Sequence, residues 1–366
     1  MNRYNRVRKP VKRYGAERFL LLTLLSFAAS VSLTRLFLQL TGYPKLGSGT
    51  LHIAHVLWGG LILFTAALLP LILANRWVYD ITALLAGVGV GLFIDEVGKF
   101  ITQNNDYFYP PAAPLIYAFF LVTVLIYLQV RRPPPREPRN EMYHALEAME
   151  EVLDRDLDEH ERDDLDTRLK SITTHAEQFP DLASLANSLQ TFLHNQDLIV
   201  LPDQPTKAER WRIQMNTWAF RHIGRARLRF AIILGLGITG TLALIKWVVF
   251  LSQSLGPDSS RQALVEMAAA SSVNTPAGMY WFVARLILEG ILGMSLLAAS
   301  LLIMIKKVRH GMNLGYYSLL LSLTTINLLL FYFDQFSTII IALLQFMVLM
   351  GMIYYRKGHV IGNQPR

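Results

Sequence analysis

Eight apolar segments, each long enough to cross a lipid bilayer, constrain the fold of this chain more than any other feature of its sequence. A transmembrane helix needs about 20 mostly apolar residues to cross a hydrocarbon core about 30 Å thick. The segments of this length are residues 17–40, 50–75, 78–100, 112–130, 228–252, 278–305, 314–334 and 337–355. Only 17% of the residues are charged, whereas soluble domains have about 25%. We therefore predict an all-α, polytopic integral membrane protein with eight transmembrane helices.

The basic residues indicate how these helices are oriented. They gather before the first helix, after the fourth, before the fifth, between the sixth and seventh, and after the eighth. The opposite loops carry little beyond Lys45 and Arg261. Because Lys-rich and Arg-rich loops stay in the cytoplasm, we predict that both termini are cytoplasmic. The plasma (inner) membrane is expected, with the lipid bilayer as a partner and no nucleic acid, since the net charge of +8 reflects this orientation.

Composition divides the chain into five parts. A basic cytoplasmic tail (1–16) precedes the first four helices (17–130). A helical cytoplasmic insert (131–226) follows, and then come the last four helices (227–355) and a cytoplasmic C-terminal tail (356–366). The insert thus separates two membrane halves of equal helix number.

The insert begins acidic and ends basic. In its acidic part, apolar residues recur at approximate helical spacing, so that one face can be buried: Met142, Leu146, Met149, Val152 and Leu157. Asp181 is placed to cap a further helix over residues 182–192. We interpret the acidic surface as a solvated face, with a docked cytoplasmic protein partner as the alternative. Residues 207–230 interleave Arg and Lys with Trp and Phe, which predicts a helix on the inner leaflet.

The two membrane halves can be aligned helix by helix. The alignment pairs ionisable residues at similar depth in three helix pairs: Arg35 with Lys246, His55 with Arg285, and Asp95 with Asp334. Each half has four helices and starts on the same side of the membrane. We therefore predict a parallel four-plus-four repeat, related by an axis along the membrane normal.

Charged residues lie near the outer ends of the predicted helices: Arg35, Asp95, Glu96, Lys99, Lys246, Arg285, Glu289 and Asp334. A charge at the centre of a transmembrane helix costs about 2.5–3.5 kcal/mol and usually faces the bundle interior or a water-filled cavity. A spacing of four residues brings Asp95 next to Lys99, and Arg285 next to Glu289. We predict an outward-facing pocket lined by both halves. The alternative is that these pairs only tie the outer helix ends together.

Two histidines raise the question of a metal. His52 and His55 are three residues apart, and with Asp95 or Glu96 they supply the two-histidine, one-carboxylate set that zinc and related metals accept. However, no other predicted helix contains a histidine, and the chain has no cysteine. We therefore predict no cofactor, and a divalent metal such as zinc is the alternative.

The seventh predicted helix carries polar side chains across its middle, a candidate path toward the inner side: Ser322, Thr324, Thr325 and Asn327. The leading hypothesis is transport or binding of a small polar or amphipathic solute. The mixture of charges indicates a zwitterionic or amphipathic molecule, or alternatively a proton-coupled step at Asp95 with His52 or His55. The first alternative is a metal-dependent membrane enzyme acting on lipid headgroups at the outer leaflet. The second is a scaffold or sensor that signals through the insert. No nucleophile elbow or phosphate-binding loop favours an enzyme.

Overall fold

The computed structural model describes residues 9–42, 54–133, 137–155, 157–174, 177–195, 224–253 and 276–361. Within these ranges the chain is helical and forms no strand. Eight of the helices are long and apolar enough to span a membrane, as predicted. The all-α, polytopic membrane fold is thereby confirmed. Residues 207–223, the larger part of the predicted interfacial helix, lie outside the described ranges.

The helices form two compact units. Unit 1 comprises Met1–Asp95 and Val122–Trp211, and unit 2 comprises Glu96–Leu121 and Arg212–Arg366. The division falls between Asp95 and Glu96, where the third predicted helix (78–100) is broken into α3 (Trp77–Asp95) and the short α4 (Val97–Ile101). The break interrupts the apolar segment at its first acidic pair.

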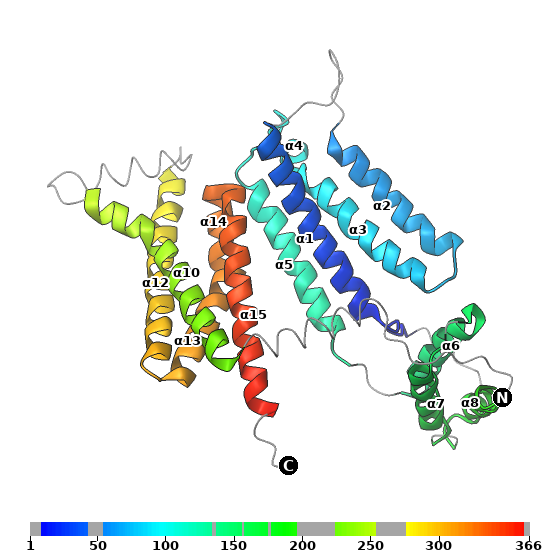
Figure 1. Ribbon diagram of the computed structural model, residues 1–366. Helices are drawn as coiled ribbons and strands as arrows, with labels where there is room; N and C mark the ends of the chain where they lie inside the picture. The colour runs from blue at the N-terminus through cyan, green and yellow to red at the C-terminus, as the bar shows by residue number, and fades with distance from the viewer. Residues whose placement is uncertain are drawn as a thin grey trace. The chain divides into compact units, whose positions relative to one another are not determined.

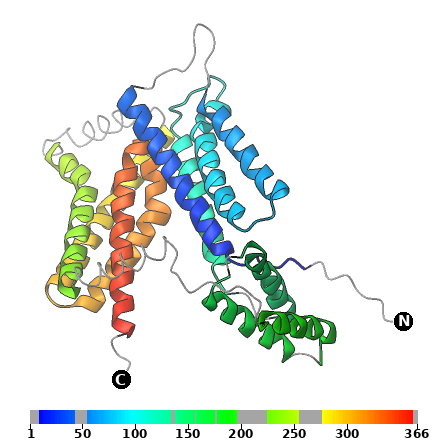
Figure 2. The ribbon, with the colours of Figure 1, turned by 45° about the vertical axis from the view of Figure 1, so that its right-hand side comes forward.

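In unit 1, α3 packs against both α1 (Ala16–Thr41) and α2 (His55–Ile72), as Figures 1 and 2 show in blue and cyan. Small residues allow this close approach. A Cβ at Gly91 would lie 2.6 Å from the side chain of Ser30 on α1, and one at Gly89 would lie 2.9 Å from the carbonyl oxygen of Gly59 on α2. The glycine-rich stretch of α3 therefore allows α1 and α2 to pack closely against it, because glycine lets helix backbones approach each other.

The described part of the insert is a three-helix cluster, drawn in green in Figure 1. It contains α6 (Pro138–Asp154), α7 (Glu159–Thr173) and α8 (Pro180–Leu193). The buried core is made by Met142, Ala145, Leu157, Leu165, Leu169, Ile172, Ala186 and Leu193. Asp158 caps α7, since its side chain accepts a hydrogen bond from the backbone of Glu161 at 2.7 Å.

Two details predicted for the insert are wrong. Leu146 is 47% exposed and does not belong to the buried face, because the helix turns it away from α7 and α8. Asp181 is not the N-cap of α8. The helix starts at Pro180, two residues earlier than predicted, with Phe179 as N-cap. Proline is well suited to the first helical position, where no backbone N–H is needed.

Acidic residues of α6 contact the basic segment before α1 and the α2–α3 loop, all within unit 1. Arg13 Nε lies 3.3 Å from Glu147 Oε1, and the Tyr14 backbone N–H donates to Glu147 Oε2 at 3.1 Å. Arg76 forms an ion pair with Glu151. The acidic face was interpreted from the sequence as solvated, whereas these two carboxylates are ion-paired with the chain itself. The insert is therefore attached electrostatically to the membrane half of unit 1.

In unit 2, α12 (Pro276–Met304) packs against α10 (Arg225–Gln253) and α13 (Val308–Leu321), and α15 (Ile339–Ile361) packs against α10 and α13. These helices are the yellow-green to red elements of Figure 2. The seventh span continues from α13 through a π-helical turn, Ser322–Ile326, into α14 (Asn327–Asp334). A short 3₁₀ helix, Gln335–Thr338, leads to α15. The start of α5 (Ala112–Val130) also belongs to this unit.

Candidate functional site

Asp95 is the centre of a buried polar cluster in unit 1, which we call the Asp95 centre: Arg35, His55 and Asp95. The carboxylate has no exposed surface. Arg35 Nε on α1 donates to Asp95 Oδ1 at 2.5 Å, and His55 Nε2 at the start of α2 lies 3.1 Å from Oδ2. One carboxylate at the end of α3 thus binds side chains from the two helices that flank it.

Arg35 also binds the backbone at the C-terminal end of α3. The last carbonyl groups of a helix have no partner within the helix. Arg35 Nη2 donates to the backbone oxygen of Asp95 at 2.9 Å, so the guanidinium bonds both the side chain and the main chain of this residue. Two hydrogen bonds from a charged group fix the rotation of α1 relative to α3 at this level.

A second cluster lies in unit 2, which we call the Arg285 centre: Arg285, Glu289 and Asp334. Arg285 is 1% exposed and donates through Nη2 to Glu289 Oε1 at 3.3 Å, one turn further along α12. The predicted Arg285–Glu289 pair is therefore present. Arg285 also forms an ion pair with Asp334 at the end of α14. The side chain of Asp334 is 26% exposed.

One nitrogen of the Arg285 guanidinium lacks a hydrogen-bond partner among the described residues. This atom, Nη1, is buried. Buried polar atoms without partners are rare in folded proteins, and a buried guanidinium nitrogen is costly to leave so. Phe333 contributes an aromatic wall, with its ring centroid 5.3 Å from the guanidinium carbon. The Arg285 centre thus offers a donor beside two carboxylates.

The structure gives a different result for each of the remaining charged residues that were predicted to line the pocket. Lys99 Nζ lies 3.1 Å from Glu96 Oε1 within unit 2, and 5.3 Å from the ring centroid of Tyr107. The predicted pairing of Lys99 with Asp95 stays a prediction. The side chain of Lys246 and the whole of His52 lie outside the described part of the chain. The convergence of the two centres on one shared pocket also stays a prediction.

The two centres have one geometric feature in common. His55 begins the second helix of its half and contacts Asp95 at the end of the third. Arg285 lies in the first half of the second helix of its half, nine residues after its start at Pro276, and contacts Asp334 at the end of the third. These are the residues that the sequence alignment paired. The packing differs, because the third helix is central in the first half and the second helix is central in the other. The four-plus-four repeat stays a prediction.

The polar residues of the seventh span separate into two groups. Ser322 and Asn327 are buried and both hydrogen-bond to Gln345 Oε1 on α15, at 3.1 and 3.0 Å. Thr324 and Thr325 are exposed on another side of the helix. The structure thus brings together two of the four residues proposed as a polar path. Their role in passage of a solute stays a prediction.

Two residues of this region were missed at the sequence level. Gln345 is the only amide in the eighth apolar segment, and that isolation was a usable signal. Tyr117 on α5 donates its hydroxyl to the carbonyl oxygen of Leu323 at 2.5 Å, inside the π-helical turn. A π-helical turn weakens the regular backbone bonding of the helix, and Tyr117 supplies a partner for one carbonyl group there. No local pattern in the sequence marks this pair.

The described residues contain no group of three or more His, Cys, Asp or Glu side chains that could hold a metal ion. His55 and Asp95 are in contact, but the predicted third ligand, His52, is outside the described ranges. The metal hypothesis is therefore untested. No protein-family model, curated protein or solved structure matches the chain.

Proposed function

We propose that this protein is a proton-coupled transporter of a small zwitterionic solute. Its proposed setting is the plasma (inner) membrane, with both termini in the cytoplasm and the two centres near the outer face. The observation that carries the proposal is Asp95, a fully buried carboxylate that contacts both a guanidinium and an imidazole. Ionisable residues inside membrane helices commonly mark proton relays or substrate paths.

Protonation of Asp95 would change how three helices are held together. The neutral acid would no longer balance the charge of Arg35, which is itself buried. Removing one charge from a buried ion pair generally costs about 3–5 kcal/mol. A proton on Asp95 therefore favours an arrangement in which the contacts of Arg35 and His55 with this carboxylate are exchanged for others. This coupling of protonation to helix position is what a proton-driven transporter requires.

His55 offers a route for the proton. It exposes 21% of its side chain, whereas Asp95 is fully buried and Arg35 nearly so. Histidine is the side chain that ordinarily gains and loses a proton between pH 5 and 8, and it serves widely as a proton shuttle. His55 is thus placed to exchange protons with water and with Asp95 Oδ2.

The Arg285 centre supplies the complementary groups for the solute. The unpartnered Nη1 of Arg285 is a donor for a carboxylate, and Arg–carboxylate contacts are among the stronger charge-assisted bonds. Asp334 is the more exposed of the two acids and is the proposed partner for the ammonium group of the solute. A molecule with both charges therefore fits this centre better than a simple anion or cation.

The proton step can be tested without knowing the solute. Proteoliposomes on a solid-supported membrane are subjected to a pH jump, and the transient charge displacement is recorded. The wild-type protein should give a displacement that Asp95→Asn abolishes. Asp80→Asn is the matched control, because Asp80 lies at the opposite end of α3 and pairs with Arg18 at 2.9 Å. An undiminished displacement in Asp95→Asn would refute the role of Asp95.

The solute class is tested by uptake driven by an imposed pH gradient. A panel of labelled amino acids and betaines is compared with a dicarboxylate and a diamine. At least one zwitterion should accumulate, and Asp334→Asn should abolish that accumulation. Uptake of none of the zwitterions would refute the solute class. Bound zinc in the purified protein, lost in His55→Ala, would instead support the alternative of a metal-dependent enzyme.

A further inference from the structure

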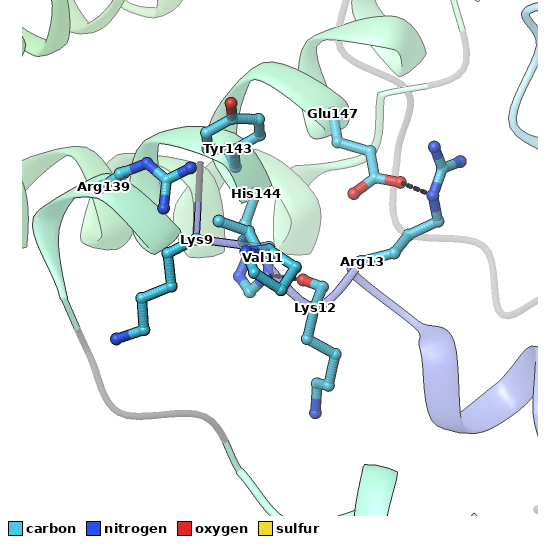
Figure 3. Close-up of a pocket in the computed structure, with 9 residues that line it drawn as sticks. Lys9, Val11, Lys12, Arg13, Arg139, Tyr143, His144 and Glu147 are labelled. Carbon is cyan, nitrogen blue, oxygen red and sulfur yellow. Dashed lines mark hydrogen bonds and ion pairs between the residues drawn. The ribbon is translucent and has the colours of Figure 1, made fainter. Parts of the chain in front are cut away.

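A basic pocket lies between the segment before α1 and the first half of α6, both in unit 1. Its volume is about 500 Å³. Figure 3 shows Arg139, Tyr143, His144 and Glu147 along one face of α6, with the Lys9–Arg13 segment beside them. Four Lys or Arg residues and one carboxylate line it, so its formal net charge is +3 with histidine neutral. The pocket therefore suits an anion.

The positive charge of this pocket is only partly neutralised by the protein. Arg13 Nε is 3.3 Å from Glu147 Oε1, the pair drawn dashed in Figure 3. Lys9 pairs with Glu137 at 3.3 Å in an exposed position, and Lys12 Nζ lies 3.9 Å from Glu17 Oε2. The guanidinium of Arg139 lies over the ring of Tyr143, 5.3 Å from its centroid, and pairs with none of the described carboxylates. Arg139 is therefore the cation most available to a ligand.

His144 provides an independent sign that a ligand group belongs here. It is 5% exposed, and its Nε2 lies 2.8 Å from the backbone oxygen of Lys12. Because a carbonyl oxygen only accepts, Nε2 carries the hydrogen, and Nδ1 is then an acceptor when the ring is neutral. Nδ1 is buried and has no partner among the described residues. The hydroxyl of a ligand would satisfy it.

The position of the pocket identifies the source of the anion. Lys12 Nζ donates to the carbonyl oxygens of Val130 and Arg132 at 2.9 and 3.1 Å, where α5 ends. Lys12 also lies four residues before the start of α1. The pocket therefore lies where two membrane helices end, on the side that we predict to be cytoplasmic. Phospholipid phosphates of the inner leaflet lie at this level, and basic pockets there bind their headgroups.

We propose that this pocket binds the phosphate group of an anionic phospholipid that carries a headgroup hydroxyl, such as phosphatidylglycerol. Arg139 and Lys9 contact the phosphate oxygens, and His144 Nδ1 accepts from the hydroxyl. The lipid thereby connects the insert with the membrane half of unit 1. This proposal does not depend on transport.

The test is titration of delipidated, detergent-solubilised full-length protein with phosphatidylglycerol, phosphatidylcholine or inorganic phosphate, followed by native mass spectrometry or calorimetry. Phosphatidylglycerol should bind more tightly than phosphatidylcholine. Arg139→Gln should weaken its binding about fivefold, the usual effect of one basic residue at a membrane surface. Arg132→Gln, which removes an exposed charge at the end of α5 outside the pocket, should leave it unchanged.

A second variant guards against misfolding. His144→Gln places an amide donor near the position of Nε2 and lacks the acceptor at Nδ1, so it should weaken lipid binding while the melting temperature stays close to wild type. Phosphate binding that depends on Arg139, without preference for phosphatidylglycerol, would overturn the lipid source and assign the site to a soluble phosphate compound. Binding of both ligands unaffected by Arg139→Gln and His144→Gln would overturn the site itself.

Discussion

Adding one methyl group at Gly59 should separate α2 from α3, whereas the same change at Gly60 should not. A Cβ at Gly59 would lie 2.7 Å from the backbone nitrogen of Phe93 and 2.9 Å from the carbonyl oxygen of Gly89. Both atoms belong to the α3 backbone, which cannot rotate away as a flexible side chain can. At Gly60 the added Cβ would have no atom within 4 Å.

The magnitude follows from two opposing effects. Replacing Gly by Ala within a helix stabilises it by about 0.8–1 kcal/mol through backbone propensity, and this gain applies equally to both positions. Overpacking a filled interface costs about 1–3 kcal/mol. Gly60→Ala should therefore be neutral or stabilising by up to about 1 kcal/mol. The difference between Gly59→Ala and Gly60→Ala isolates the overpacking cost, since propensity cancels.

Equilibrium unfolding in mixed micelles would measure this difference, with the pH-jump charge displacement as the functional measurement. His55 lies one helical turn before Gly59, so displacement of α2 should lengthen its 3.1 Å contact with Asp95. Gly59→Ala should reduce both stability and charge displacement, and Gly60→Ala neither. Equal stability and equal displacement in the two variants would refute the packing argument and the connection of α2 to Asp95.

Three further predictions concern unit 2 and the insert. Gln345→Leu should destabilise the protein by about 2–3 kcal/mol in micelle unfolding, because it leaves the buried Ser322 and Asn327 without their shared acceptor. Tyr117→Phe should cost about 1 kcal/mol in the same measurement, since it removes the hydrogen bond to the Leu323 carbonyl oxygen and little volume. Asp166→Asn should lower the stability of the insert near pH 7 by about 0.2–1 kcal/mol. Hydrogen exchange of the backbone amides of α7 and α8 measures this change.

The contribution of the Asp166 carboxylate to the stability of the insert depends on pH. Burial alone would raise the pKa of Asp166, but hydrogen bonds from Lys170 and Gln190 lower it below the ordinary value of 3.8. The ionised form therefore stabilises the fold above about pH 4, and this contribution is lost as the pH falls toward the lowered pKa. Asp163→Asn, which removes a carboxylate at an exposed position of α7, is the matched control for Asp166→Asn. For the micelle-unfolding measurement on Gln345→Leu in unit 2, the matched control is Thr324→Val, at an exposed position of the seventh span.

Length and polarity alone were sufficient to predict the helices. Each of the eight apolar segments contains a helix long and apolar enough to span a membrane, because a membrane-spanning segment must satisfy its backbone hydrogen bonds within itself. The pairing of Arg285 with Glu289 was equally predictable, since four residues correspond to about one helical turn. Both predictions use only local sequence, and neither requires knowledge of which helices are in contact.

The tertiary structure decided the partners of the polar groups. Asp95 contacts residues 60 and 40 positions away in the chain, and Tyr117 bonds a carbonyl group 206 positions away. Such pairs depend on how helix faces rotate and pack, and hydrophobic periodicity says nothing about which apolar face meets which. The attachment of the acidic helix to the basic N-terminal segment has the same origin, because opposite charges in a sequence predict attraction without naming the partner.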